Sequence, residues 1–312
     1  MAVRLLMKAS VDRIVDEGGG IRSFYFKPQD RREFPPVPPG AHTLLRVSKG
    51  VMRQYSLCTP PGDPRYRIAI HLDAGGRGGS RFMHESARVG DIFYLSYPQP
   101  DFPLDLDLPS YRFFAGGVGI TPILSFLHAL RGRSCRVRLH YFVRADERVP
   151  FEREIRALCP QAEIIDPGKE GRVALTDLLR GAEGDAIYCC GGAPFVSALQ
   201  QAAKSLGLPD IHAESFVAGV KTGHLGDPFI MDLPRSRHVL HVPSDRTMLE
   251  VLLGDGVDID YACEAGVCRS CIVDVIEGEI IHRDQCLTDE ERRTLMTPCV
   301  SRGRGRIVIN SL

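Results

Sequence analysis

The stretch CEAGVCRSC, from Cys263 to Cys271, decides how the C-terminal part of this 312-residue chain folds. It places Cys263, Cys268 and Cys271 in a C-x4-C-x2-C run, and Cys299 follows in TPCVSRGRG. This order of thiol ligands is the plant-type pattern for a [2Fe-2S] cluster, and small residues such as Ala265 let three thiolates converge on one centre. The spacing therefore predicts a ferredoxin-like domain at the C-terminus.

A structural zinc site with four cysteine ligands is the alternative interpretation of this motif. Such sites usually use paired C-x2-C spacings, which fit the run poorly. Cluster ligands are thiolates and not cystines, so the motif favours a reducing compartment. Apart from Cys190, the remaining cysteines are interpreted as buried or inert thiols, and these are Cys58, Cys135, Cys159, Cys189 and Cys286.

Composition sets the outer limits of the interpretation. A formal net charge of +0, with 44% hydrophobic and 25% charged residues, gives no support to nucleic-acid binding or to a polybasic membrane surface. No segment approaches the roughly 18 consecutive apolar residues of a membrane span, and MAVRLLMKAS is interrupted too early for a signal peptide. A soluble cytoplasmic protein without a membrane partner is the expectation.

Two stretches with different hydrophobic rhythms precede the cysteine motif. Short alternating runs at residues 41–47, 66–72 and 91–97 are separated by Gly and Pro clusters, which predicts an antiparallel β-barrel. From Tyr111 onward, the strand-like segments YRFFAGG, RVRLHYFV, AEIID, DAIYCCGG and IHAESF alternate with helical ones, which predicts a Rossmann-like parallel α/β sheet covered on both faces. The expected domains are residues 1–108, 109–222 and 236–312, with residues 223–235 as a linker.

The first candidate ligand site lies in MRQYSLCTP, a run that is typical of a strand entering a turn. Residues at i and i+2 share a face, so Arg53 and Tyr55 can address one ligand. A strand arginine is more often part of a solvated face. The candidates in this run are Arg53, Gln54, Tyr55 and Ser56.

A second motif, GGRGGSRFMHE, places Gly78, Gly79 and Ser80 ahead of a helix-forming segment. Backbone N–H groups at such a helix start can hold a phosphate without a cluster of cations. Taken alone, GGS is more often an ordinary loop and cap.

The loop AGGVGITP follows the strand YRFF and contains Gly116, Gly117 and Gly119. Thr121 is expected as the N-cap of the next helix and Pro122 as its first residue. This loop allows a pyrophosphate to approach the backbone, although it is not the G-x-G-x-x-G fingerprint.

Two further segments end predicted strands, where open α/β sheets bind ligands. YCCGGAP supplies Cys190 and Gly191, and HAESF supplies Glu214, Ser215 and Phe216. The alternative interpretation is a buried cysteine before a turn and a core phenylalanine.

The preference between NADH and NADPH is open at this point. Arg144 and Arg148 follow the second predicted strand and suit a phosphate, whereas Asp146 and Glu147 between them suit a ribose hydroxyl. No general acid or base is nominated, and the scattered histidines are taken as structural, namely His71, His84, His212 and His224.

Together these motifs resemble the phthalate dioxygenase reductase family, which includes vanillate O-demethylase reductases, over essentially the whole chain. The resemblance implies that the flavin is FMN. Arg53 and the turn of Gly79 and Ser80 would contact its phosphate, and Tyr55 and Ser56 would lie against the isoalloxazine.

The resemblance also implies NADH as electron donor, bound by the GGVGITP loop. Cys190 would lie beside the nicotinamide and Phe216 near the flavin ring, so that Ser56, Cys190 and Phe216 border the redox centre. Gly192 departs from relatives that carry Pro after the Cys-Gly pair.

A nicotinamide releases two electrons together and a [2Fe-2S] cluster accepts one, so a carrier that can do both is needed between them, and a flavin is such a carrier. The resemblance implies transfer from NADH through FMN and the cluster to a Rieske-type oxygenase or demethylase, with the reductase as a monomer. A haem monooxygenase or another ferredoxin-dependent acceptor is the alternative. A zinc-binding or redox-sensing scaffold would leave the flavin and nicotinamide motifs unexplained. Arg269, where relatives often carry Gly, is expected at the face that meets the acceptor.

Overall fold

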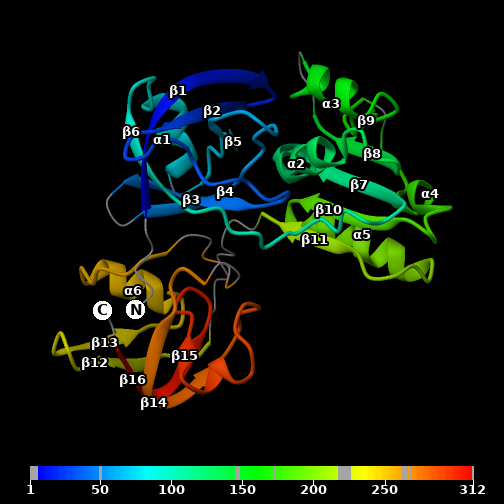
Figure 1. The fold of residues 1–312 in the computed structure, drawn as a ribbon. Coiled ribbons are helices and arrows are strands. Elements are labelled where there is room, and N and C mark those ends of the chain that lie inside the picture. Colours follow the sequence, from blue (N-terminus) through cyan, green and yellow to red (C-terminus); the bar gives the residue numbers. More distant parts are fainter. Residues whose placement is uncertain are drawn as a thin grey trace. The chain divides into compact units, whose positions relative to one another are not determined.

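Three β-sheets organise the chain (Figure 1). The computed structural model describes residues 6–48, 51–76, 78–144, 148–169, 171, 173–216, 226–261, 264, 266 and 269–310. The contacts divide the chain into two compact units, one of Met1–Leu45 with Tyr55–Phe216 and one of Arg46–Gln54 with Val217–Leu312. None of the helices in the described part of the chain has the length and apolar character needed to span a bilayer.

The first sheet has the strand order β4-β3-β6-β1-β2-β5. Pairing is antiparallel between β1 and β2, β1 and β6, and β2 and β5. A bridge between Leu57, directly after β4, and Ile68 on β5 joins the two edge strands, so the sheet closes and the predicted antiparallel barrel is confirmed. Its elements are β1 (Leu6–Gly18), β2 (Ile21–Pro28), β3 (His42–Ser48), β4 (Val51–Ser56), β5 (Tyr66–His71), α1 (Gly79–Glu85) and β6 (Ile92–Ser96).

The second sheet is wholly parallel and has the order β11-β10-β7-β8-β9. This confirms the predicted parallel α/β domain, with a helix between each pair of successive strands. Its elements are β7 (Ser110–Gly116), the 3-10 turn η1 (Gly117–Gly119), α2 (Ile120–Leu130), β8 (Arg136–Phe142), α3 (Glu152–Leu158), β9 (Glu163–Ile165), α4 (Leu175–Leu179), β10 (Ala186–Gly191), α5 (Ala193–Ser205) and β11 (His212–Ser215).

Alternation along the central strands divides this domain into two cores. Phe113 and Cys190 pack on one face of the sheet with α2 and α3. Phe114 and Cys189 pack on the other face with α4 and α5. Figure 1 shows the two helix pairs on opposite sides of the sheet. Because neighbouring residues of a strand point to opposite faces, the adjacent cysteines belong to different cores.

A buried ion pair connects the barrel to the nucleotide domain within the first unit. Arg67 on β5 donates from both terminal nitrogens to Glu154 on α3, at 2.8 and 2.7 Å. His128 on α2 lies 2.6 Å from the same carboxylate. Burial would raise the pKa of Glu154, but the bonds from His128 and Arg67 outweigh it and lower that pKa to about 2. The carboxylate therefore stays ionised and holds the two domains in register.

The third sheet has the order β13-β12-β16-β14-β15, with β12 and β16 parallel and the other pairs antiparallel. Helix α6 packs Met248, Leu249 and Leu252 into the core of this domain and begins with a capping box between Thr247 and Glu250. A mixed sheet with one packed helix is the predicted β-grasp fold. Its elements are β12 (Phe229–Leu233), β13 (His238–Val242), α6 (Met248–Gly254), β14 (Val273–Ile281), η2 (Glu291–Arg293), β15 (Leu295–Met296) and β16 (Arg302–Asn310).

Strand β12 lies inside the stretch 223–235 that the sequence predicted as linker. Its five residues, FIMDL, directly follow the Gly- and Pro-containing segment. The alternating pattern of so short a strand does not distinguish it from that segment in the sequence. The first strand of the third domain therefore lies before residue 236, where the sequence placed the start of that domain.

Candidate functional site

The order of the parallel strands creates a switch point between β7 and β10. The chain runs outward from β7 to β8 and β9 on one side, and from β10 to β11 on the other. Open α/β sheets bind ligands in the crevice where the two directions part, outside the carboxyl ends of the strands. The predicted Gly116 loop follows β7 and the predicted Cys190–Gly191 turn ends β10, so the structure brings both motifs to this point.

Backbone contact between the two loops is very close. A Cβ atom on Gly119 would lie 2.5 Å from the carbonyl carbon of Cys190 and 2.8 Å from the Gly191 nitrogen, and closer still to the Cys190 carbonyl oxygen. Gly117 has a φ of 55°, and none of the described atoms lies within 4 Å of the position where its Cβ would be. Gly119 therefore permits contact between the two loops, and Gly117 leaves open space beside them. That open space fits a bound pyrophosphate.

The predicted N-cap at Thr121 is wrong. Helix α2 begins at Ile120 and its N-cap residue is Gly119. Thr121 is 2% exposed, and its hydroxyl donates to the Val118 carbonyl at 2.9 Å. The 3-10 turn η1 starts the helix two residues earlier than a threonine cap would, so Thr121 stabilises that turn from within.

Cys190, Glu214 and Phe216 are brought together at the same end of the sheet. Cys190 pairs with Glu214 across β10 and β11, and its Sγ lies 3.8 Å from a Glu214 carboxylate oxygen. The Phe216 nitrogen donates to the Gly191 carbonyl at 3.0 Å. The Ser215 hydroxyl is buried and has no hydrogen-bond partner among the described residues. An orphaned hydroxyl at a ligand-binding edge fits a polar group of a bound nucleotide.

Burial dominates the acid–base chemistry of this cluster. It raises the pKa of the Cys190 thiol well above its usual range, and the neighbouring Glu214 carboxylate adds to the effect. Burial and the Asp101 carboxylate also raise the pKa of Glu214, to about 7. Cys190 is therefore a neutral thiol, which is suited to packing against a ligand and not to acting as a nucleophile. The sequence pattern located Glu214 but assigned it no role, because nothing in HAESF indicates its desolvation.

Glu214→Gln is expected to change the pH dependence of stability. The pKa of Glu214 in the folded protein, about 7, exceeds its usual value of 4.5. The contribution of protonated Glu214 to stability is therefore fully present below pH 4.5 and is lost as the pH rises through 7. The free energy of unfolding falls by on the order of 3 kcal/mol in the wild type, and the neutral amide of the variant does not show this fall. Urea unfolding of both proteins at pH 5 and pH 8.5 measures the difference, and parallel stability curves would contradict the assignment.

The strand β4 carries the four candidate flavin residues. Ser56 Oγ and Gln54 Oε1 are buried and have no hydrogen-bond partner in the part of the chain that the structure describes. Arg53 donates to the Met52 carbonyl at 2.8 Å, a hydrogen bond that uses one of its five N–H groups. Unsatisfied buried polar atoms cost free energy unless a ligand engages them, so the donor and acceptor set on β4 fits a flavin ring.

Gly79 and Ser80 are the first residues of α1, with Gly78 as its left-handed N-cap at a φ of 85°. Among the described atoms, none lies within 4 Å of a Cβ built on Gly78. The Ser80 hydroxyl accepts from the Asp73 nitrogen at 3.1 Å and closes the preceding turn. A helix follows this motif as predicted, but it begins at Gly79, so only Gly78 of the three residues precedes it. The open side at Gly78 suits a close ligand.

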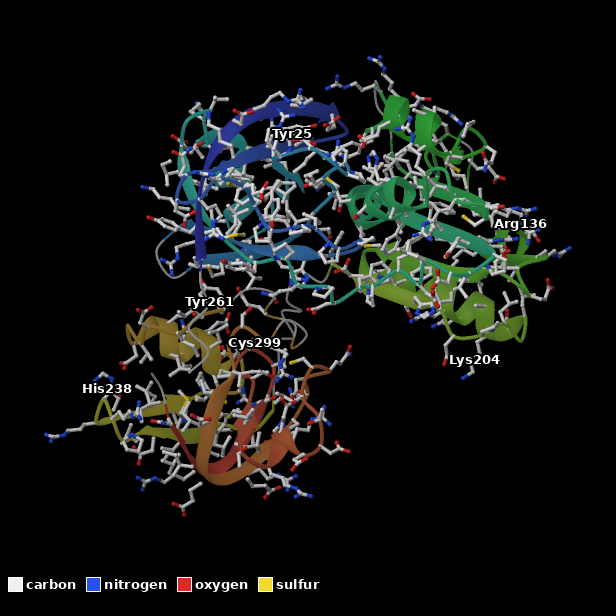
Figure 2. All side chains as sticks on the ribbon, in the orientation of Figure 1. Tyr25, Arg136, Lys204, His238, Tyr261 and Cys299 are labelled. Atoms are coloured by element: carbon white, nitrogen blue, oxygen red, sulfur yellow. The ribbon has the colours of Figure 1, made fainter. Side chains whose placement is uncertain are left out.

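Cys271 and Cys299, the two candidate cluster ligands within the described residues, are each 4% exposed. Cys271 precedes β14 and Cys299 follows β15, and these strands pair antiparallel at Val273 and Met296. Both thiols therefore extend from the same end of one strand pair, and Cys299 lies toward the same end of the domain as Tyr261 (Figure 2). Two buried cysteines at the same end of one strand pair fit a [2Fe-2S] cluster, whereas Cys263 and Cys268 lie outside the described residues.

Arg148, a candidate for the phosphate of NADPH, has other partners. Its Nη2 donates to the carbonyl and the carboxylate of Asp16, at 2.5 and 2.8 Å. The pKa of Asp16 is lowered most by the hydrogen bond from the Gly18 backbone N–H, and the hydrogen bond from Arg148 lowers it further. Asp146 and Glu147 lie outside the described residues. The pairing with Asp16 agrees with NADH as the donor.

Two of the histidines interpreted as structural have structural contacts. His84 is buried with its Nε2 2.8 Å from the Ile70 carbonyl oxygen, and burial lowers its pKa. His212 stacks on Tyr188 at a centroid distance of 4.6 Å. Neither is arranged as a general acid or base.

A barrel with a polar strand, a doubly wound nucleotide domain and a β-grasp domain with buried cysteines define a class, the flavin reductases that carry their own ferredoxin domain. A sequence model of the 2Fe-2S iron-sulfur cluster binding domain matches residues 232–302.

Full-length relatives narrow the class. The chain is 35% identical to a vanillate O-demethylase oxidoreductase of Pseudomonas sp., over 94% of this chain and 95% of the relative. It is also 35% identical to the beta subunit of a haem-dependent oxidative N-demethylase of Ectopseudomonas mendocina, over 89% and 90%. The solved structure of phthalate dioxygenase reductase, described as modular for electron transfer from pyridine nucleotides to [2Fe-2S], superposes with a TM-score of 0.76 at 29% identity and covers 98% of both chains.

The chain belongs to the phthalate dioxygenase reductase family. It is an oxidoreductase that uses NADH, FMN and a [2Fe-2S] cluster, and it is the reductase component of an oxygenase system.

Proposed function

We propose that the three domains divide the work of electron transfer. Residues 1–108 bind FMN, residues 109–222 bind NADH, and the β-grasp domain from Phe229 onward holds the cluster on Cys263, Cys268, Cys271 and Cys299. The convergence of η1, the Cys190–Gly191 turn and the Glu214–Phe216 segment at one switch point carries the nucleotide assignment.

The protein groups mainly bind and orient the cofactors. When bound, FMN accepts the electron pair of NADH and releases electrons singly, which matches the one-electron cluster. Gly117 and Gly119 let the pyrophosphate approach the backbone at the start of α2. Cys190 presents a neutral thiol and Phe216 an aromatic face beside the reacting rings. Ser56 offers its buried hydroxyl to the isoalloxazine.

Arg53→Ala is expected to weaken FMN binding by about tenfold or more, because a charge-assisted hydrogen bond to a phosphate contributes about 1.5–3 kcal/mol. Equilibrium dialysis of the flavin-free protein measures the dissociation constant. Arg65→Ala is the control, since Arg65 belongs to the same barrel, forms an ion pair with Asp63 at 2.9 Å and has no assigned role in ligand binding. Equal FMN affinity of the Arg53 variant and the wild type would contradict the assignment.

A Rieske-type oxygenase or demethylase is the acceptor that we propose. The 35% identity to a vanillate O-demethylase oxidoreductase supports it, and equal identity to the haem-dependent N-demethylase subunit makes a haem oxygenase the second candidate. Thiolate ligands require a reducing compartment, for which we propose the cytoplasm, and a monomer suits a transient partner.

Reconstitution with purified oxygenase components of both kinds distinguishes the two acceptors. Product formed per NADH oxidised is the measurement. We expect tight coupling with the Rieske component and uncoupled NADH oxidation with the haem component, and the reverse pattern would assign the haem partner.

A further inference from the structure

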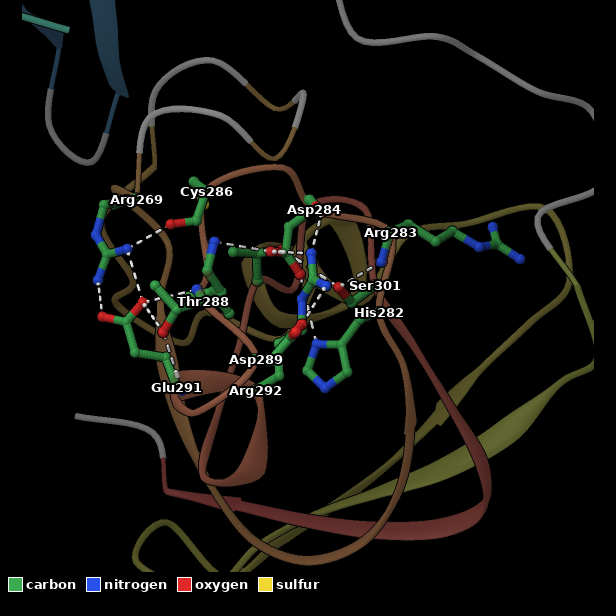
Figure 3. Close-up of polar contacts among 12 residues, drawn as sticks. Arg269, His282, Arg283, Asp284, Cys286, Thr288, Asp289, Glu291, Arg292 and Ser301 are labelled. Carbon is green, nitrogen blue, oxygen red and sulfur yellow. Dashed lines mark hydrogen bonds and ion pairs between the residues drawn. The ribbon is translucent and has the colours of Figure 1, made fainter.

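A short segment between β14 and β15 lies against the described residues of the cluster-binding loop, which comprises residues 263–271. This strap, defined as His282–Glu291, contacts the part of that loop that the structure describes, and Figure 3 shows its hydrogen bonds with Arg269. The Gln285 nitrogen donates to the Gly266 carbonyl at 3.0 Å. Arg269, between two candidate cluster ligands, donates from Nη1 to the Cys286 carbonyl at 2.5 Å. The strap and the loop are therefore joined at both backbone and side-chain level.

Arg269 is the strongest of these connections. Its guanidinium donates to both carboxylate oxygens of Glu291, at 2.5 and 3.1 Å, while its backbone has a left-handed φ of 60°. A bidentate pair fixes orientation as well as distance, and a non-glycine residue occupies that backbone region at an energetic cost. Arg269 therefore retains a strained conformation in which its side chain reaches the strap.

The carboxylate of Glu291 is also held in place by Thr288, independently of Arg269. Thr288 donates to Glu291 from its nitrogen at 2.9 Å and from its hydroxyl at 3.2 Å, and the Glu291 nitrogen donates back to that hydroxyl at 3.3 Å. These reciprocal hydrogen bonds are of the capping-box type and close the turn that leads into η2. Because Glu291 is already oriented, the ion pair costs less side-chain entropy than an ordinary surface pair.

The other end of the strap is anchored in the domain. The Asp284 side chain has no exposed surface and accepts from the Leu287 nitrogen at 3.0 Å and from Arg292 Nη2 at 3.4 Å. A Cβ on Gly266 would lie 3.0 Å from the Asp284 Cα and 2.6 Å from a Val300 methyl carbon. The cluster-binding loop thus packs without spare room against the strap and against the turn that carries Cys299.

We propose that Arg269 and Glu291 form a latch that holds the strap over the cluster-binding loop and slows loss of the cluster. In this role Arg269 is a positioning residue, and its charge is compensated inside the domain instead of serving the acceptor. The inference rests on the proposed ligand set of Cys263, Cys268, Cys271 and Cys299.

A double-mutant cycle tests the latch in the full-length holoprotein. Arg269→Gln, Glu291→Gln and the double variant keep side-chain size, and the amide oxygen introduced by Glu291→Gln can still accept from Thr288. The measurement is the first-order decay of cluster absorbance in excess iron chelator. Each single variant is expected to lose the cluster about threefold to fivefold faster, and the double variant no faster than either single one.

Arg304→Gln and Glu279→Gln provide the matched control. Their ion pair, at 2.8 Å, crosses the exposed face of β14 and β16 in the same domain, and its loss should leave the decay rate unchanged. Decay at the wild-type rate in both latch variants, or additive effects in the double variant, would overturn the latch alone. A wild-type protein that never acquires cluster absorbance would overturn the ligand assignment, and the latch with it.

Discussion

Cys299→Ser is expected to yield a protein that retains its flavin, lacks cluster absorbance and transfers no electrons to an oxygenase above background. A serine hydroxyl stays protonated at neutral pH and is a hard ligand, so it replaces a soft thiolate poorly at an iron-sulfur centre. NADH-driven reduction of ferricyanide, which needs only the flavin, should remain within about twofold of wild type because the two sites are in separate domains.

The control for this prediction is Cys286→Ser. Cys286 lies in the same domain and between two ligand positions in the sequence, but it is outside the C-x4-C-x2-C run and is not one of the four candidate ligands. We expect the control to keep the cluster. Cluster absorbance retained in the Cys299 variant, or lost in the control, would mean that the ligand set is wrong.

Gly119→Ala is expected to disrupt NADH oxidation. The new methyl group would meet backbone atoms of Cys190 and Gly191, which cannot move aside as a flexible side chain can. Overpacking of this kind costs about 1–3 kcal/mol of stability. Separation of the two loops also misplaces the nucleotide. We therefore expect the rate of flavin reduction by NADH to fall about a hundredfold.

Gly192→Ala is the matched control for the same turn. Its φ of −67° suits any residue, and the nearest described atom to its Cβ would be 3.9 Å away. Stopped-flow reduction by NADH under anaerobic conditions gives both rates. If the Gly119 variant reduces its flavin as fast as the Gly192 variant, the close approach of the loops has no role in nucleotide binding.

Much of the fold could be predicted because periodicity and turn residues act locally. The alternation in residues 66–72 corresponds to β5, and the glycine-rich ends of YRFFAGG and DAIYCCGG mark the carboxyl ends of β7 and β10. The neighbouring position of those two strands then follows from the doubly wound order of such domains.

The missed features depend on contacts between distant segments. The raised pKa of Glu214 arises from burial and from Asp101, about which the local sequence carries no signal. The partner of Arg269 lies on the strap, so the sequence motif could place Arg269 at the surface but could not indicate its ion pair with Glu291. The start of α2 was misplaced because η1 precedes it, and Gly-Val-Gly is not a typical helix opening.

The most direct test of the electron path is an anaerobic titration of the purified protein with NADH, followed by visible spectroscopy and repeated with NADPH. We predict flavin bands together with cluster absorbance, both bleached by NADH and only slowly by NADPH. A protein that carries flavin and cluster but is reduced by neither nucleotide would contradict the assigned nucleotide site, and a colourless zinc-containing protein would contradict the proposed function as a whole.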